Sequence, residues 1–238
     1  MGWGSFSINP ATPSPGPTSD TFTTFVPLKN LVTDVASIVK AAPIEVVQAA
    51  YVRAARQLSG ESRWLRYTPS PDSQMAANTR QYNLSFSDAN VEIIGIAAAA
   101  VQDLASSWHP LKTLSSPNSL DLNAQPNFPA WYAYIDEAQV MFDPIPNLAY
   151  TWRVQLIVQV ALTATAMPTE FVNKFNRRIE AGALAFLYGM SGESWYNPNE
   201  AARFNMEFQE GINQAKAWVN RGFQGGSVRA NGRAFLAS

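Results

Sequence analysis

Apolar side chains recur every three or four residues along a segment in the last third of the chain, residues 168–189. Residues with this spacing lie above one another on one face of a helix. The repeating positions are Phe171, Phe175, Ile179, Ala183 and Phe186. The pattern predicts a helix that ends at Gly189 to Gly192, where the glycines accept left-handed backbone angles.

A second segment with the same period begins at Asn197. Asn197 is suited to cap free backbone N–H groups, Pro198 fits the first helical position, and Glu200 stands where a capping box places its acid. The apolar positions are Ala201, Phe204, Phe208, Ile212, Ala215 and Val219, and Gly222 ends the run. We expect the two helices to fold back on each other.

The core of this helical hairpin is predicted from its large apolar residues. Burial of each such side chain contributes about 1.5–3 kcal/mol, so these residues are expected to face the partner helix. The predicted hairpin core is Phe175, Ile179, Phe186, Phe204, Phe208 and Ile212.

A third helical pattern lies near the start of the chain. Pro43 fits the first turn of a helix over residues 44–59, and Gly60 is expected to cap it. Its predicted buried stripe is Val47, Ala50, Tyr51, Ala54 and Leu58. Residues 27–42, which precede it, predict a short helix, although valine has a low helix propensity and weakens this prediction.

Between these helices the apolar period shortens to two, which indicates β-strands. Strands are predicted over residues 64–67, 80–86, 131–135, 138–142 and 151–165, of which the last alternates most regularly. Residues 91–101 carry an alanine run that alone favours a helix, but the β-branched flanks, together with the family resemblance given below, favour a strand with a loop or bulge. The prolines of residues 108–127 predict a protruding loop or hairpin, and Asp136 and Glu137 predict a turn.

The two ends of the chain show no such period. Residues 1–26 are rich in Pro, Ser, Thr and Gly, which favours an extended path, either as a flexible linker or as a strap along a neighbouring subunit. The strap would be anchored by Trp3, Phe6, Phe22 and Phe25. Residues 223–238 contain three glycines and no acidic residue, so we expect that this arm does not fold alone.

These patterns together predict an α+β fold. A helical bundle, residues 27–60 and 168–222, is interrupted by an inserted antiparallel β domain, residues 61–167. Extended arms, residues 1–26 and 223–238, flank it.

Composition narrows the classes of function. The chain has 238 residues, of which 47% are apolar, and a formal net charge of −1, which argues against binding nucleic acid over its whole surface. It has no cysteine, which excludes disulfides and thiolate metal sites. No secretory signal is evident, and the apolar stretches 93–101 and 154–167 are too short or too interrupted to span a bilayer, so we expect a soluble protein.

The sequence contains only weak signals for a catalytic site. His109 is the only histidine, no Gly-x-Ser-x-Gly sequence occurs, and a strand would point Asp136 and Glu137 in opposite directions. The segment 225–229 lacks the lysine of a phosphate-binding loop. We therefore expect neither an enzyme nor a bound cofactor or metal.

The hairpin carries a resemblance to a known family. Its residues Gly182-Ala183-Leu184, Leu187, Trp195-Tyr196-Asn197-Pro198, Ala201, Phe208 and Gly211-Ile212 are similar to the C-terminal signature of phage head-to-tail adaptors. These are head-completion proteins of short-tailed and some long-tailed bacteriophages. The resemblance covers about residues 43–222 and implies that the helix over residues 44–59 packs on the hairpin.

The resemblance also implies a structural role at the head-tail junction of a virion assembled in the host cytoplasm. Twelve copies would form a ring beneath the portal protein and line the channel through which double-stranded DNA leaves. The ring would present a surface to the next tail component, a nozzle or tail-tube protein. The C-terminal arm would dock on the portal through Phe223, Arg229, Arg233, Phe235 and Leu236.

Two alternatives remain open. A non-specific nucleic-acid-binding module is suggested by the arginines of the final third, Arg177, Arg178, Arg203, Arg221, Arg229 and Arg233. In an adaptor we expect these arginines to act mainly in subunit contacts. A hydrolase would require His109 or a carboxylate pair to converge in a pocket.

Overall fold

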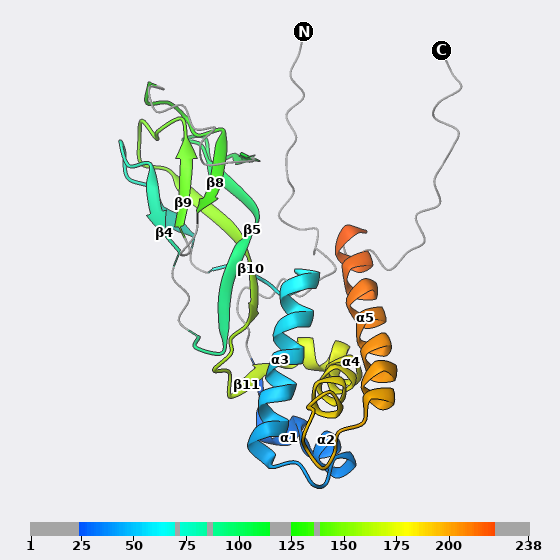
Figure 1. Cartoon of the computed structure of the whole chain (residues 1–238). Helices are drawn as coiled ribbons and strands as arrows, with labels where there is room; N and C mark the ends of the chain where they lie inside the picture. The colour runs from blue at the N-terminus through cyan, green and yellow to red at the C-terminus, as the bar shows by residue number, and fades with distance from the viewer. Residues whose placement is uncertain (1–23, 70–71, 85–87, 115–124, 136–138, 222–238) are drawn as a thin grey trace, which may run out of the picture.

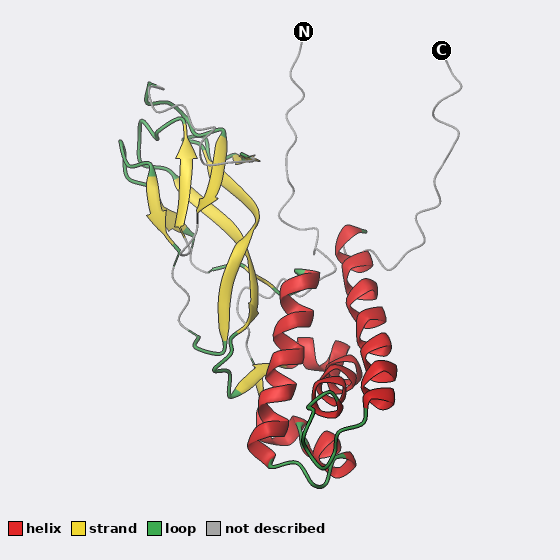
Figure 2. Cartoon of the chain, in the orientation of Figure 1, coloured by secondary structure: helices red, strands yellow, loops and turns green. Residues whose placement is uncertain are grey.

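The structure is a computed structural model that describes residues 24–69, 72–84, 88–114, 125–135 and 139–221. The helices gather in one body and most strands in another, whereas β11 lies beside the helices (Figures 1 and 2). This is the α+β fold that the sequence predicts. The helices are α1 (Leu28–Leu31), α2 (Thr33–Ile38), α3 (Ile44–Ser62), α4 (Thr169–Tyr188) and α5 (Pro198–Asn220).

The strands belong to three sheets. A ribbon pairs β1 (Phe25–Pro27) with β11 (Ala166–Pro168). The second sheet has the order β2 (Arg66–Tyr67), β10 (Thr151–Val160), β5 (Val91–Gln102) and β6 (Trp108–Pro110), with β3 (Ser73–Gln74) also on β10. The third has the order β4 (Gln81–Asn83), β9 (Gln139–Asp143), β8 (Trp131–Ile135) and β7 (Lys112–Thr113). Every pairing is antiparallel except that of β7 with β8.

The long ribbon of β5 and β10 connects the two bodies. Its register shifts opposite Gln155/Leu156 and Ile157/Val158, which confirms the bulged strand expected in the alanine-rich segment. At its lower end in Figure 1 the ribbon runs alongside α3, while the third sheet lies at the other end.

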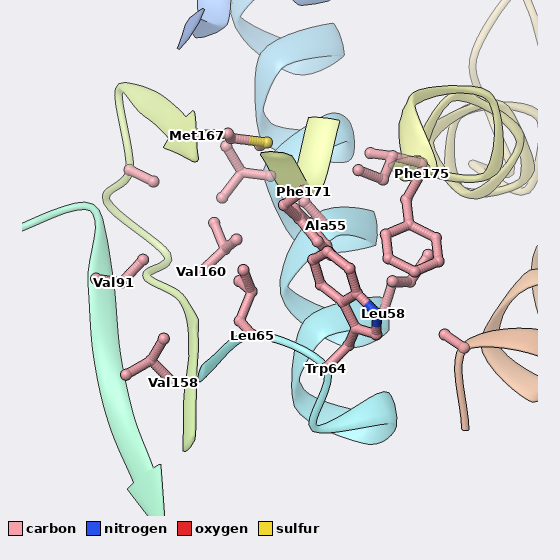
Figure 3. Close-up of a cluster of buried hydrophobic side chains, with 14 of the residues drawn as sticks. Ala55, Leu58, Trp64, Leu65, Val91, Val158, Val160, Met167, Phe171 and Phe175 are labelled. Carbon is pink, nitrogen blue, oxygen red and sulfur yellow. The ribbon is translucent and has the colours of Figure 1, made fainter. Parts of the chain in front are cut away.

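One continuous apolar core joins the helices to this ribbon. Side chains from α3, β10 and α4 point toward one another around Trp64 and Leu65, which follow α3 (Figure 3). The Trp64 ring meets Phe175 edge to face with 5.0 Å between centroids, and Phe171 lies 6.2 Å away. Aromatic pairs in this geometry add stabilisation beyond their buried area, so the joint between the bodies is a packed core.

The predicted end of α3 is wrong. The helix continues through Gly60 to Ser62, and its C-cap is Arg63, whose φ is 53°. The predicted end of α4 is confirmed, because the helix ends at Tyr188 and Gly189 is its C-cap. Gly189 keeps right-handed angles, and the left-handed residue is Gly192, with φ 91°.

Other differences concern the strands. Strand β10 ends at Val160, before the end predicted for it. Asn90 holds the turn that follows: its carbonyl accepts a hydrogen bond from the Ala161 N–H, and its side chain accepts hydrogen bonds from the N–H groups of Thr165 and Ala166. Phe25 and Val26, expected in the N-terminal arm, pair with β11. The predicted loop of residues 108–127 contains β6 and β7.

Some predictions fall on residues outside the described part of the chain. These are most of the N-terminal arm, the end of the strand predicted over residues 80–86, the turn at Asp136 and Glu137, the cap at Gly222 and the whole C-terminal arm. Among the described helices, none is long and apolar enough to cross a membrane.

Candidate interaction surfaces

Helices α3, α4 and α5 meet at Gly182. A Cβ atom at this position would lie 2.8 Å from the Cβ of Ala54 on α3 and 2.8 Å from the Phe208 ring on α5. About one turn along the hairpin, Gly211 leaves room for the stem of Arg178, whose Cγ would lie 2.7 Å from an added Cβ. Only glycine permits these approaches without a shift of the neighbouring helix.

Four residues of the predicted hairpin core are buried. Phe175, Ile179, Phe208 and Ile212 expose 2% or less of their surface. Phe186 and Phe204 are half-buried and pack against the core at its rim. The Arg53 guanidinium lies 5.6 Å from the centre of the Phe186 ring, and Phe204 stacks on Tyr188.

The start of α5 follows half of the expected capping pattern. The Asn197 side chain accepts a hydrogen bond from the Glu200 N–H at 3.2 Å, and Pro198 occupies the first turn. The return bond of a capping box is replaced, since the Asn197 N–H donates to the carbonyl of Tyr188 at 2.9 Å. The Glu200 carboxylate instead accepts from Arg203 at 2.7 Å.

Two shallow hollows meet at the Phe186 ring. One is lined by Val46, Ala49 and Arg53 of α3 together with Met190, and the other by Ala185, Ala201, Ala202 and Asn205. Phe186 lines both hollows. The ring stays partly exposed because its neighbours are mostly alanines, which are too small to cover it. We call this surface the Phe186 hollows.

A charged surface lies on another side of the hairpin and is lined by Arg177, Arg178, Met206, Glu207 and Glu210. The Arg178 guanidinium donates to the Glu207 carbonyl at 3.3 Å and lies 3.5 Å from a Glu210 oxygen. Arg177 pairs with Glu207 at 3.3 Å, yet its side chain is 87% exposed. Met206 is 68% exposed. We call this surface the Met206 flank.

The described arginines of the last third do not form a free basic surface. Arg177 and Arg178 pair with Glu207, and Arg203 pairs with Glu200, whereas Arg221, at the end of α5, is exposed and has no ion-pair partner among the described residues. These pairs cancel charge locally, which removes much of the attraction for phosphates that the DNA-binding alternative requires. Arg229 and Arg233 lie outside the described residues.

Side chains of α3 hold both backbone groups of Val160, the last residue of β10. The Val160 N–H donates to Ser59 Oγ at 3.1 Å, and its carbonyl accepts from Arg56 at 3.2 Å. Arg56 also pairs with Glu92 of β5, which holds the pKa of that carboxyl below its usual range. The sequence pattern gave no sign of this joint, because its partners lie about a hundred residues apart.

A second polar chain links α3 to α4. The Tyr51 hydroxyl donates to Asn176, whose amide donates to Glu180. Burial is the main cause that raises the pKa of Tyr51, and burial followed by repulsion from Asp34 raises the pKa of Glu180. This network stabilises the contact between the two helices and does not open into either surface described above.

His109 lies on β6 and faces Asp103, with 2.7 Å between Nε2 and Oδ2. Asp103 also accepts from the N–H groups of Ala105 and Ser107, so the pair fixes the turn between β5 and β6. Hydrogen bonds, the strongest from His109, lower the pKa of Asp103. Within the described ranges no group of three or more His, Asp or Glu side chains is placed to hold a metal ion.

The docking residues that the resemblance implies, Phe223, Arg229, Arg233, Phe235 and Leu236, lie outside the described residues. No protein-family model matches this chain, and a search of curated proteins finds no match.

Proposed function

We propose that this protein is a structural virion component: a ring-forming adaptor that links the portal to the tail of a tailed bacteriophage and lines the DNA exit channel. The observation that supports the proposal is where the residues of the resemblance lie. Gly182 is the contact point of three helices, Ala183, Leu184, Leu187, Phe208 and Ile212 are buried, and Asn197 caps α5. These residues specify one hairpin geometry rather than a generic amphipathic helix pair.

The same arrangement suits a subunit that must associate with copies of itself. The bundle closes its core around Gly182 and still presents the Phe186 hollows and the Met206 flank on its outside. Interfaces between subunits favour apolar centres, arginine and methionine. In the proposed ring of twelve copies, the bundle carries these contacts and the next tail component binds an outer surface.

In this proposal the C-terminal arm attaches the ring to the portal. Phe235 and Leu236 enter apolar sites on the portal, while Arg229 and Arg233 pair with acidic groups. Ordering each backbone residue of the arm costs about 1–2 kcal/mol, so a single arm binds weakly. A ring multiplies the attachment by avidity.

The experiment is attachment to portal-bearing heads. The chain deleted after Gly222 is expected to fold with the circular dichroism of the full chain but to fail to sediment with the heads. The double variant Phe235→Ala/Leu236→Ala is expected to lose most of the attachment, while the control Ser238→Ala retains it. Equal attachment of the deleted chain would place the docking element on the bundle and contradict the role of the arm.

The alternative of non-specific DNA binding is tested on the same protein. Binding to phosphates by several arginines falls by orders of magnitude as salt rises. We expect weak binding of the isolated chain to double-stranded DNA at low salt, since three of the relevant arginines are paired within the chain. Tight, steeply salt-dependent binding by a monomer would favour the alternative.

A further inference from the structure

We propose that the N-terminal arm of this chain closes as a strap over the end of α5, with Asp20 paired to Lys174 and Phe22 packed against Trp218. The strap is formed by residues 18–23, which lie outside the described residues. It adds to the proposed function and does not depend on it, since both of its contacts lie within one subunit.

The described chain begins beside the first turn of α4. Strand β1 pairs with β11, and just before β1 the Thr24 carbonyl accepts a hydrogen bond from the Thr169 N–H at 3.1 Å. Because Thr169 is the first residue of α4, a chain that continues this antiparallel path runs along the start of that helix. Lys174 lies about 7.5 Å further along the helix axis, and an extended segment from Thr24 to Asp20 spans up to about 13 Å. The reach of the arm therefore brings Asp20 to Lys174.

Lys174 offers a charge for the strap to pair with. Its side chain is exposed, and its ammonium lies 4.1 Å from the centre of the Trp218 ring. Among the described residues, that ammonium forms no ion pair. Residues 1–23 contain one charged side chain, the Asp20 carboxylate. This carboxylate supplies the opposite charge, while the ammonium keeps its contact with the ring.

Trp218 is the half-exposed end of a row of aromatic rings. Trp64, Phe171 and Phe175 lie together in the interior (Figure 3). The Trp218 ring continues the row, with 5.9 Å between its centroid and that of Phe175. Phe175 exposes 2% of its surface, whereas Trp218 is half-buried. Phe22 beside Trp218 extends the row and buries apolar surface of both side chains, which stabilises the closed strap.

The spacing of the two strap residues matches the two contacts. In an extended segment, side chains two positions apart point to the same side. Asp20 and Phe22 therefore face the bundle together. Their partners Lys174 and Trp218 are in contact with each other, so one pass of the chain satisfies both.

Other occupants fit this surface less well. The C-terminal residues 223–238 contain no acidic side chain, so they cannot pair with Lys174. The N-terminal arm of a second copy carries the same residues, but the hydrogen bond between Thr24 and Thr169 already holds the chain's own arm beside α4. The strap is therefore assigned to the chain's own residues.

The experiment uses a carbodiimide, which joins a carboxylate to an amine with the loss of one water molecule and no spacer. The full-length chain is treated at low concentration and digested, and the linked peptides are identified by mass spectrometry. An amide between Asp20 and Lys174 is expected. The described ion pair of Glu61 with Lys216, at 2.9 Å, is the positive control, because it is expected to give a link in every sample.

A matched pair of variants tests the aromatic contact. Phe22→Ala is expected to lower the yield of the link between Asp20 and Lys174 several-fold, because the strap loses its ring. Phe6→Ala removes a ring from the same arm and is expected to leave the yield unchanged. Asp20→Asn is expected to abolish the link and to leave the control link intact.

The outcomes separate the strap from other arrangements and from the proposed function. Chains labelled with heavy nitrogen are mixed with unlabelled chains, and links are expected within single chains. Links between labelled and unlabelled chains would assign the arm to a second copy and overturn the strap. Links from Asp20 to Lys29 or Lys40 in place of Lys174, or no link beside a normal control, would also overturn it. Failure to attach to portal-bearing heads would contradict the adaptor function and leave the strap in place.

Discussion

The helical bundle and the β domain surround their half-buried aromatic residues differently, because Tyr82 and Phe128 of the β domain lie against other aromatic rings. In the β domain, Phe142 and Trp152 meet edge to face at 5.0 Å and expose 3% or less of their surface. In the bundle, Phe175 and Phe208 are equally buried, but Phe186 and Phe204 stay at the rim. The difference reflects neighbouring residues, because the bundle surrounds Phe186 with alanines.

The surfaces differ in the same way. The most exposed large apolar residues of the β region and its connections, Leu104 and Leu162, belong to separate turns. Single exposed apolar residues are normal in folded proteins, whereas neighbouring exposed apolar residues are typical of a binding surface. The comparison therefore favours the bundle as the place where the proposed subunit contacts would form. The β domain extends from it through the ribbon of β5 and β10.

The largest expected change in stability comes from a buried ring of the bundle, compared with a ring at the rim of its core. Phe208→Ala removes a ring that is 1% exposed and is expected to lower the free energy of unfolding by about 3–5 kcal/mol. Phe204→Ala, at the rim, is expected to cost clearly less. Urea unfolding measures both. Similar losses for the two variants would mean that the distinction between core and rim is wrong.

A related measurement asks whether the two regions unfold together. Because the core is continuous across α3 and β10, Phe142→Ala in the β domain and Phe208→Ala in the bundle are expected to shift the same single transition. Two separate transitions, each sensitive to one variant, would show that the regions are independent domains.

The next effect concerns the joint at Val160. Ser59→Ala removes the acceptor of the buried Val160 N–H and is expected to lower the free energy of unfolding by about 1–3 kcal/mol. Ser37→Ala is the control, because the Ser37 hydroxyl donates only to an exposed carbonyl of its own helix. Thermal unfolding measures the loss of stability in both variants. Equal losses would show that the hydrogen bond from Val160 to Ser59 does not stabilise the fold.

The pH dependence of the same joint gives a smaller effect. Arg56 lowers the pKa of Glu92 in the folded chain, so the ion pair stabilises the fold above the ordinary carboxyl pKa and is lost as pH falls through the lowered value. Glu92→Gln is expected to be less stable than the original chain at neutral pH and equal to it in acid. A difference that is constant with pH would contradict this assignment.

The smallest expected effect is a gain in stability, on substitution of Glu180. Burial and Asp34 raise the pKa of Glu180, so its charged form opposes folding above the raised value. Glu180→Gln keeps an acceptor for the Asn176 amide and is expected to raise the unfolding temperature slightly at neutral pH. The gain should vanish in acid, where Glu180 is protonated. A loss of stability at neutral pH would show that the charge is favourable.

Much of the fold was predictable from the sequence. Long amphipathic runs place α3, α4 and α5 within a few residues, because one buried face per helix leaves a strong period. The cap at Asn197 follows from local chemistry, and the bulged strand β5 follows from its β-branched flanks together with the family resemblance. The continuation of α3 through Gly60 was not predictable in this way, because glycine is a common residue just beyond the end of a helix.

The candidate surfaces were less predictable. Whether Phe186 is buried depends on the size of residues from three helices, and periodicity along one helix cannot report this. The pairing of Arg178 with Glu207 and Glu210 likewise requires α4 and α5 to be placed side by side. The serine and arginine that hold Val160 look like ordinary polar positions until β10 lies against α3.

The central claim is that this chain forms a ring that sits on a portal. The most direct measurement is particle imaging by electron microscopy of the full chain mixed with portal-bearing heads. The account predicts closed rings of bundles beneath the portal, with the DNA channel open through the centre. Heads without added density, or monomers of this chain scattered along free DNA, would contradict it.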